Sequence, residues 1–81
     1  MNIRIRLMGH DLPVAGFNEL SLNDNSTVED ALLTYLEAND VGLGIKELSK
    51  SQFIVNKAHC SIQHPLKDQD ELTVIRYLGG G

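Results

Sequence analysis

Apolar and charged residues alternate at the start of the chain. In the segment IRIRL, residues 3–7, isoleucine and leucine are separated by Arg4 and Arg6. This period of two is typical of a strand with one face buried and the other in water. The segment GFNELSL, residues 16–22, predicts a second and less regular strand through Phe17, Leu20 and Leu22, which a bulge would explain. The two are close enough in sequence to form a hairpin.

The segment NSTVEDALLTYLEAND, residues 25–40, predicts the main helix. Ser26 or Thr27 can act as N-cap, because a hydroxyl accepts a hydrogen bond from a free N–H of the first turn. Glu29 and Asp30 each stand three residues after one of these candidates, as in a capping box. Apolar residues then recur at the three- and four-residue spacing of a helix with one buried face: Val28, Ala31, Leu32, Tyr35 and Leu36.

The rest of the chain predicts short elements separated by turn residues. They are a loop with a short helical turn over 41–51, a strand over 52–56, a turn at 56–57, an edge strand over 60–62 and a last strand over 72–78. The order of strands around one crossing helix predicts an α+β fold, in which a mixed sheet wraps the helix. A right-handed crossover would place the last strand parallel to the first, in the middle of the sheet.

Composition narrows the class of protein. The 81 residues are enough for one domain with a modest aliphatic core. A net charge of −4 gives no basic surface for nucleic acid. No apolar run approaches the length of a membrane span, and the N-terminus lacks the continuous apolar stretch of a signal peptide. The single cysteine, Cys60, excludes an internal disulfide and a four-thiolate iron–sulfur cluster. We expect a cytoplasmic protein without nucleic-acid or membrane partners.

Three of the seven glycines are the last three residues, directly after the predicted last strand. No turn follows at that point, so conformational freedom does not explain them; the remaining reasons are the need for a chain without Cβ atoms, or chance. A frayed terminus or a remnant of expression is the alternative interpretation. The sequence thus predicts a domain over residues 1–78 and a flexible glycine tail over 79–81.

Several segments together resemble the MoaD/ThiS family of ubiquitin-like sulfur carriers. They are TVEDAL at the helix start, FIVNK after it, HPLKDQDELTVI before the end, and the terminal glycines. The resemblance implies a β-grasp fold and a C-terminal glycine, Gly81, that an E1-like enzyme adenylates with ATP and magnesium and that is then converted to a thiocarboxylate. It implies a tail and partner-binding segment composed of Arg76, Tyr77, Leu78, Gly79 and Gly80.

The chain departs from the family pattern at two places. It ends in three glycines where the family usually has two, which leaves the register of the tail open by one residue. Gln69 stands where a glycine commonly precedes the aspartate, here Asp70; this change affects only a turn.

The resemblance also implies partners and a pathway. The chain would be a carrier without catalytic residues or bound cofactors of its own, and its partners would be the E1-like adenylating enzyme and a sulfurtransferase. Molybdopterin synthesis, in which it would be the small subunit of the synthase beside the large subunit, is the first choice. Thiamine synthesis with a thiazole synthase, or another sulfur-containing product, remains open. The alternatives are a β-grasp interaction module that is never activated and a protein modifier joined to lysines.

Other residues with chemical potential have simpler explanations. Arg4 and Arg6 are predicted to form a solvated face of the first strand, with docking of the E1-like enzyme as the alternative. The pattern His59-Cys60-x-x-x-His64 lacks a clear fourth ligand for zinc, so no metal site is predicted. Cys60 is interpreted as a small core residue, with a role as sulfur relay left open.

Overall fold

The computed structural model describes residues 1–9, 16–39 and 44–75. Residues 10–15, 40–43 and 76–81 lie outside the described part. Within it, the elements follow the order β1 (Asn2–Met8), β2 (Asn18–Ser21), α1 (Val28–Ala38), α2 (Ile45–Leu48), β3 (Gln52–Val55), β4 (Ala58–Cys60) and β5 (Glu71–Ile75).

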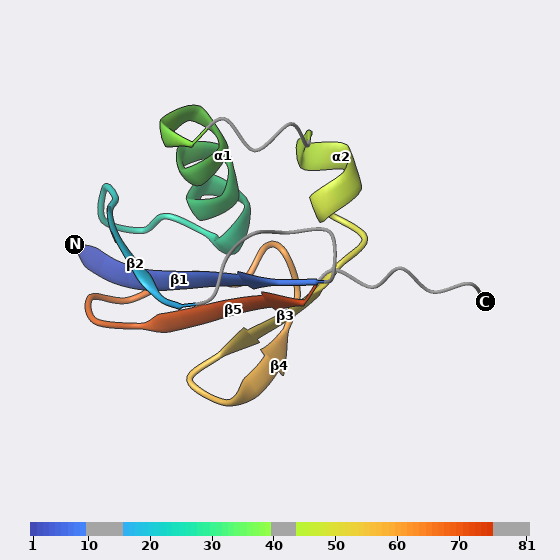
Figure 1. Cartoon of the computed structure of the whole chain (residues 1–81). Coiled ribbons are helices and arrows are strands. Elements are labelled where there is room, and N and C mark those ends of the chain that lie inside the picture. Colours follow the sequence, from blue (N-terminus) through green and yellow to red (C-terminus); the bar gives the residue numbers. More distant parts are fainter. Residues whose placement is uncertain (10–15, 40–43, 76–81) are drawn as a thin grey trace.

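The strands form one five-stranded sheet in the order β2-β1-β5-β3-β4. The two central strands, β1 and β5, run parallel, with Ile5 opposite Leu72 and Met8 opposite Ile75. The other pairs are antiparallel. The predicted hairpin and the predicted parallel pairing of the first and last strands are both confirmed, and Figure 1 shows β1 and β5 side by side in the middle of the sheet.

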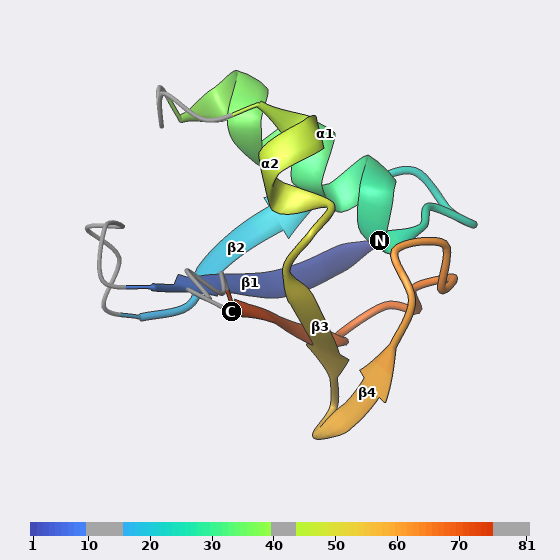
Figure 2. The same ribbon diagram turned by 90° about the vertical axis from the view of Figure 1, so that its right-hand side faces the viewer.

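Helix α1 covers one face of the sheet, as the two views in Figures 1 and 2 show. The alternation in β1 places Ile3, Ile5 and Leu7 on this covered face, where they are fully buried. The helix contributes its apolar stripe, and Leu48 of α2 closes one end of the same core. The aliphatic core predicted from the sequence is confirmed: Phe53 and Tyr35 are its only aromatic members among the described residues.

The start of α1 is capped by Thr27. Its hydroxyl accepts from the Asp30 N–H at 3.3 Å, and the Asp30 carboxylate accepts from the Thr27 N–H at 2.9 Å, which is a capping box. Ser26, the other predicted candidate, instead donates its hydroxyl to the carbonyl of Asn23. The capping box decides between the two candidates because only Thr27 has an acid three residues later that reaches back to it.

The next N–H groups of the helix are bound by a distant segment. Val28 and Glu29 donate to the carbonyls of His64 and Ile62 at 3.0 and 2.9 Å. The chain between β4 and β5 is therefore held against the first turn of α1, where free N–H groups need partners.

Two predicted strand boundaries were wrong. The edge strand lies at Ala58–Cys60 and not at 60–62, because Asn56 and Lys57 both adopt positive φ. Such a two-residue turn lets pairing resume at once, with Val55 opposite Ala58. Phe17 precedes β2 and is 38% exposed. The part of the last strand predicted over 76–78 lies outside the described residues.

Candidate functional site

The residues predicted to carry the function all lie outside the described part of the chain. They are Arg76, Tyr77, Leu78, Gly79, Gly80 and Gly81. What the structure does place is the strand that precedes them: β5 is the middle strand of the sheet and ends at Ile75, opposite Met8. Hydrogen-bonded neighbours on both sides therefore fix the point from which the predicted glycine tail begins.

The face of the sheet opposite α1 has no element of the described chain over it (Figures 1 and 2). Here a hollow is lined by apolar side chains from three strands and the segment before β2, together with polar groups. We call six of its lining residues the open-face patch: Arg6, Met8, Phe17, Ile54, Thr73 and Ile75. Lys57 and Glu71 line the hollow beside them. Met8 and Phe17 are 42% and 38% exposed, so the patch presents apolar surface next to the end of β5.

Arg6 is the polar centre of the open-face patch. Its guanidinium lies over the ring of Phe17, 4.4 Å from the centroid, within the range of a cation–π contact. One terminal nitrogen lies 3.4 Å from the Thr73 hydroxyl. Its Nε is buried and has no hydrogen-bond partner within the described part of the chain. The prediction that Arg6 belongs to a solvated face was therefore wrong in part, because Phe17 packs against it and removes part of its surface from water.

Arg4 lies one step further along the same face. It forms a salt bridge with Glu71, its neighbour across the β1–β5 pair. Its guanidinium is 5.9 Å from the Phe17 ring. The two arginines thus differ: Arg4 has a carboxylate partner, whereas Arg6 has none within 4 Å among residues 1–9, 16–39 and 44–75.

Sequence reasoning missed the apolar members of this patch. A signal was present in the alternation of the strands. Met8 lies on the same outward side of β1 as Arg4 and Arg6. Ile54 and Ile75 lie on the opposite side of their strands from the core residues. An apolar residue at an outward position is common on protein surfaces and by itself indicates nothing. Only the strand order brings the four apolar residues together.

The acidic turn before β5 has a structural role. Asp70 accepts from the Lys67 N–H at 2.8 Å. Asp68 accepts from the Asn2 N–H at 2.7 Å, and this backbone hydrogen bond, with a weaker one from Gln69, lowers the pKa of Asp68. The first contact closes the turn, and the second joins the turn to the start of β1, beside the start of β5.

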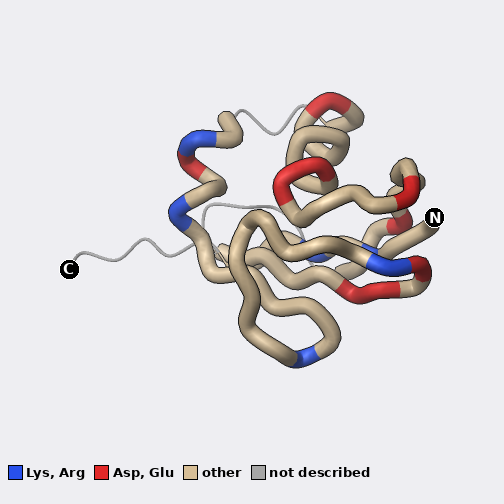
Figure 3. The backbone as a smooth tube through the Cα atoms, turned by 180° about the vertical axis from the view of Figure 1, so that it is seen from behind, with Lys and Arg blue, Asp and Glu red and all other residues tan. Residues whose placement is uncertain are grey.

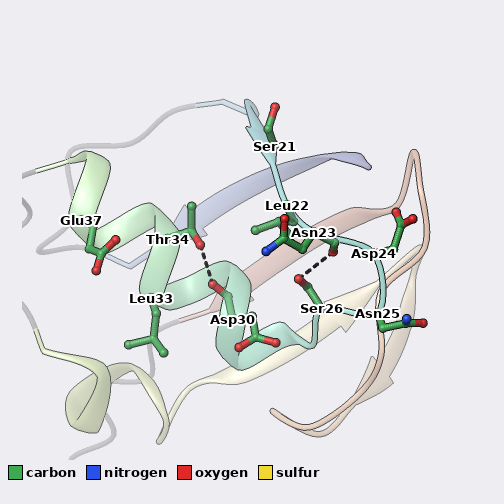
Figure 4. Close-up of a pocket in the computed structure, with 10 residues that line it drawn as sticks. All are labelled: Ser21, Leu22, Asn23, Asp24, Asn25, Ser26, Asp30, Leu33, Thr34 and Glu37. Carbon is green, nitrogen blue, oxygen red and sulfur yellow. Dashed lines mark hydrogen bonds between the residues drawn. The ribbon is translucent and has the colours of Figure 1, made fainter.

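A second hollow lies between α1 and the loop that precedes it (Figure 4). Asp30 and Glu37 of the helix line it together with Asp24 of the loop. Figure 3 shows acidic residues on α1 and on the loops near the N-terminus. Asp30 is already used in the capping box, and the hydroxyls of Ser26 and Thr34 donate to backbone carbonyls. Asp30, Ser26 and Thr34 are thus used within the fold, and we assign the hollow no chemistry.

Cys60 is half-buried at the end of the edge strand β4. Burial raises the pKa of its thiol, which favours the protonated and less nucleophilic form. In the described part of the chain, no group of three or more His, Cys, Asp and Glu side chains is placed to hold a metal ion. None of its helices has the length and apolar character to cross a bilayer.

A mixed sheet with a parallel central pair and one helix across a face is the β-grasp roll of ubiquitin-like proteins, which confirms the predicted fold class. The model of the ThiS family matches residues 5–81, and the chain belongs to this family of ubiquitin-like sulfur carriers.

Solved structures show the same fold. SAMP1 from Haloferax volcanii is similar with a TM-score of 0.77 and 19% identity over 100% of both chains. A chain in the complex of subunits 1 and 2 of molybdopterin-converting factor from Helicobacter pylori 26695 is similar with a TM-score of 0.64 and 22% identity, again over 100% of both chains. No curated protein matches the sequence.

Proposed function

We propose that this chain carries sulfur on its C-terminal residue, Gly81. In this proposal an E1-like enzyme joins the Gly81 carboxylate to the AMP moiety of ATP, with release of pyrophosphate. A sulfur nucleophile delivered by a sulfurtransferase then displaces AMP and leaves a thiocarboxylate. Transfer of this sulfur to an acceptor, with water supplying the oxygen that replaces it, returns Gly81 to a carboxylate. ATP and magnesium belong to the enzyme.

The observation that carries the proposal is the match of the ThiS family model, which extends through the last glycine, Gly81. The fold supports it, because β5 is held on both sides up to Ile75 and so offers the following residues from a rigid base. A carrier of this kind needs a stable platform and an accessible end, and it needs no catalytic side chains of its own.

Chemistry explains why glycine suits this end. A carboxylate is a poor electrophile, and its conversion to a mixed anhydride provides a leaving group. The enzyme must align the carboxylate with the α-phosphate, and positioning and charge neutralisation supply most of the catalysis. A Cβ next to the reacting carbonyl would crowd this arrangement.

Insertion of the tail into an enzyme costs entropy. Ordering the three glycines costs about 1 to 2 kcal/mol for each residue, or roughly 3 to 6 kcal/mol in total. Backbone hydrogen bonds to the partner and contacts of Arg76, Tyr77 and Leu78 would offset this cost. These three residues are therefore proposed to bind the partner and not to react.

We propose molybdopterin synthesis as the pathway, with the chain as the small subunit of the synthase and the large subunit as its partner. The similarity to a chain from a two-subunit complex of molybdopterin-converting factor supports this choice. Thiamine synthesis with a thiazole synthase is the second candidate, favoured by the match to the ThiS family model.

Intact mass spectrometry of the protein, isolated from its native cells without acid or strong nucleophiles, tests the proposal. We expect a species in which one oxygen at Gly81 is replaced by sulfur. Persistent absence of this species when the sulfur source is present, or a native chain that continues uncut beyond Gly81, would overturn the proposal. Attachment of the chain to lysines of other proteins would favour a modifier instead. Sulfur transfer to a purified synthase large subunit or thiazole synthase distinguishes the two pathways.

A further inference from the structure

Strand β2 lies at one edge of the sheet, and among the described residues its only strand neighbour is β1. Leu22, directly after β2, donates its N–H to the Met1 carbonyl at 2.9 Å and accepts from the Met1 amine at 2.8 Å. In an antiparallel pair, residues that exchange two bonds in this way alternate with residues whose backbone groups point away from the partner strand. The N–H and C=O groups of Glu19 and Ser21 therefore point to the outer edge.

The hollow between α1 and the loop before it lies beside this edge, on the helix side of the sheet (Figure 4). Ser21 and Leu22 line it from the end of β2, and Leu33 lines it from α1. Its volume of about 620 Å³ is within the range of ligand sites. Leu33 is 43% exposed. Unpaired strand backbone beside an exposed apolar side chain is what an added strand requires, because the backbone supplies hydrogen bonds and the apolar side chain a contact for alternate residues.

The charge of the hollow narrows the kind of segment that fits. Its ionisable lining residues are all acidic: Asp24, Asp30 and Glu37. Asp24 lies 3.6 Å from the Met1 amine, and its side chain is 89% exposed. No lysine or arginine in the described part of the chain forms an ion pair with any of the three. Complementary charge at an interface favours the correct partner, so the segment should carry lysine or arginine next to an apolar residue.

The hollow is remote from the end of β5. Ser21 is opposite Asn2 at the start of β1, whereas Ile75 is opposite Met8 at its other end. The six steps along β1 from Asn2 to Met8 span about 20 Å, and Figure 1 shows the two ends of this strand on opposite sides of the sheet. A segment bound here would therefore leave the end of β5 uncovered.

We propose that the edge of β2 and this hollow together bind an extended segment of a partner protein as an additional strand of the sheet. We call the site the β2–α1 groove, composed of Glu19, Ser21, Leu22, Leu33 and Glu37. The segment pairs its backbone with Glu19 and Ser21. Its alternate side chains point toward α1, with an apolar one against Leu33 and a lysine or arginine beside the acidic residues. This site is separate from Gly81 and goes beyond the carrier function.

Selection of random heptapeptides displayed on phage, with the full chain as the target, tests the proposal. We expect enriched peptides in which an apolar residue and a lysine or arginine stand two positions apart, because such residues share one face of a strand. Leu33→Lys should weaken binding of a synthesised selected peptide at least about tenfold, since it removes the apolar contact and adds a like charge. Glu37→Lys should weaken it by a smaller factor.

Met8→Lys is the matched control. It makes the same change at a residue of similar exposure, 42%, outside the groove. Its affinity for the peptide should stay within about twofold of the wild type, and circular dichroism should show an intact fold for every variant. Absence of enrichment, enriched peptides without basic residues, or equal binding to Leu33→Lys and the wild type would overturn the proposal.

Hydrogen exchange of individual amides tests the strand pairing itself. Saturating peptide should slow exchange of the Glu19 and Ser21 N–H groups at least about tenfold, while the Leu20 N–H, which points to β1, should change little. Peptide binding without this protection would contradict an added strand. Self-association of the chain that Leu33→Lys abolishes would identify a second copy as the occupant and also overturn the proposal. None of these measurements involves Gly81 or an activating enzyme, so their outcome is independent of the proposed function.

Discussion

The side chain of Asn56 joins two turns that lie far apart in sequence. It donates to the Asp70 carboxylate at 2.8 Å and accepts from the Glu71 N–H at 3.0 Å. The backbone N–H of Asn56 donates to the Glu71 carbonyl at 3.0 Å. Asp70 is only 8% exposed, so Asn56 and the Lys67 N–H together satisfy a buried carboxylate. The start of β5, the strand that leads to the proposed reactive end, is thereby fixed to the β3–β4 turn.

Asn56→Gly should destabilise the fold by about 1 to 3 kcal/mol, because it leaves the buried Asp70 carboxylate and the Glu71 N–H without these partners. Glycine adopts the positive φ of position 56 without strain, so the loss reports the side-chain bonds. Urea unfolding measures it. Lys57→Gly is the control at the neighbouring position of positive φ, and it should change stability by less than about 1 kcal/mol. A loss of similar size in both variants would contradict the assigned role of Asn56.

Gln69→Gly should stabilise the fold. Gln69 has a φ of 72°, a left-handed conformation that costs a residue with a Cβ about 1 to 2 kcal/mol. The greater backbone entropy of glycine in the unfolded chain cancels part of the gain, so we expect an increase of up to about 1 kcal/mol in the free energy of unfolding. The departure from the family pattern thus has a conformational cost. A lower urea midpoint for Gln69→Gly would show that its side chain contributes more than the strain removes.

Cys60 should react slowly with iodoacetamide near neutral pH. Desolvation raises the pKa of its thiol in the fold, so the native rate should increase with pH through a higher midpoint than in urea-unfolded protein. The fold disfavours the thiolate, so the corresponding stability is present below the unfolded pKa and is lost as pH rises through the folded pKa. A native midpoint below the unfolded one would instead indicate an activated thiol and revive the role of sulfur relay.

Gly80→Ala should leave the fold intact and impair activation. The added methyl group lies next to the reacting residue, and one methyl group misplaced in a close-fitting site typically costs about 10- to 200-fold in kcat/KM. Pyrophosphate exchange with the E1-like enzyme measures the effect. Gly79→Ala, one residue further from the carboxylate, should be impaired less. Normal adenylation of Gly80→Ala would show that the site tolerates a Cβ and that the glycines have another reason.

The elements of this fold could be predicted because their signals are local. The alternation of apolar and charged residues in β1 shows which side faces the core. The residues from Thr27 onward predict a capped helix with one apolar stripe. The pairing of the first and last strands followed from the handedness of the crossover. The turn predicted at Asn56 and Lys57 is confirmed, but the start of the strand after it was placed two residues too late, because the sequence does not show that pairing resumes directly after a two-residue turn.

The candidate site was also predictable only in part from the sequence. The sequence alone marked the terminal glycines, through their number and position, and marked Arg4 and Arg6 as outward residues of a strand. It did not distinguish the two arginines. Glu71 and Phe17 did so, one as an ion-pair partner of Arg4 and the other as a platform for Arg6.

The sequence by itself predicted the order of the elements, the start of the main helix and the glycine end, since each of these signals lies within a few positions of the chain. Only the tertiary structure decided that Met8, Phe17, Ile54 and Ile75 share one surface and that Arg6 lies among them. The reason is that strand order, and not spacing along the chain, brings these side chains together, and their individual outward positions carry no sign of one another.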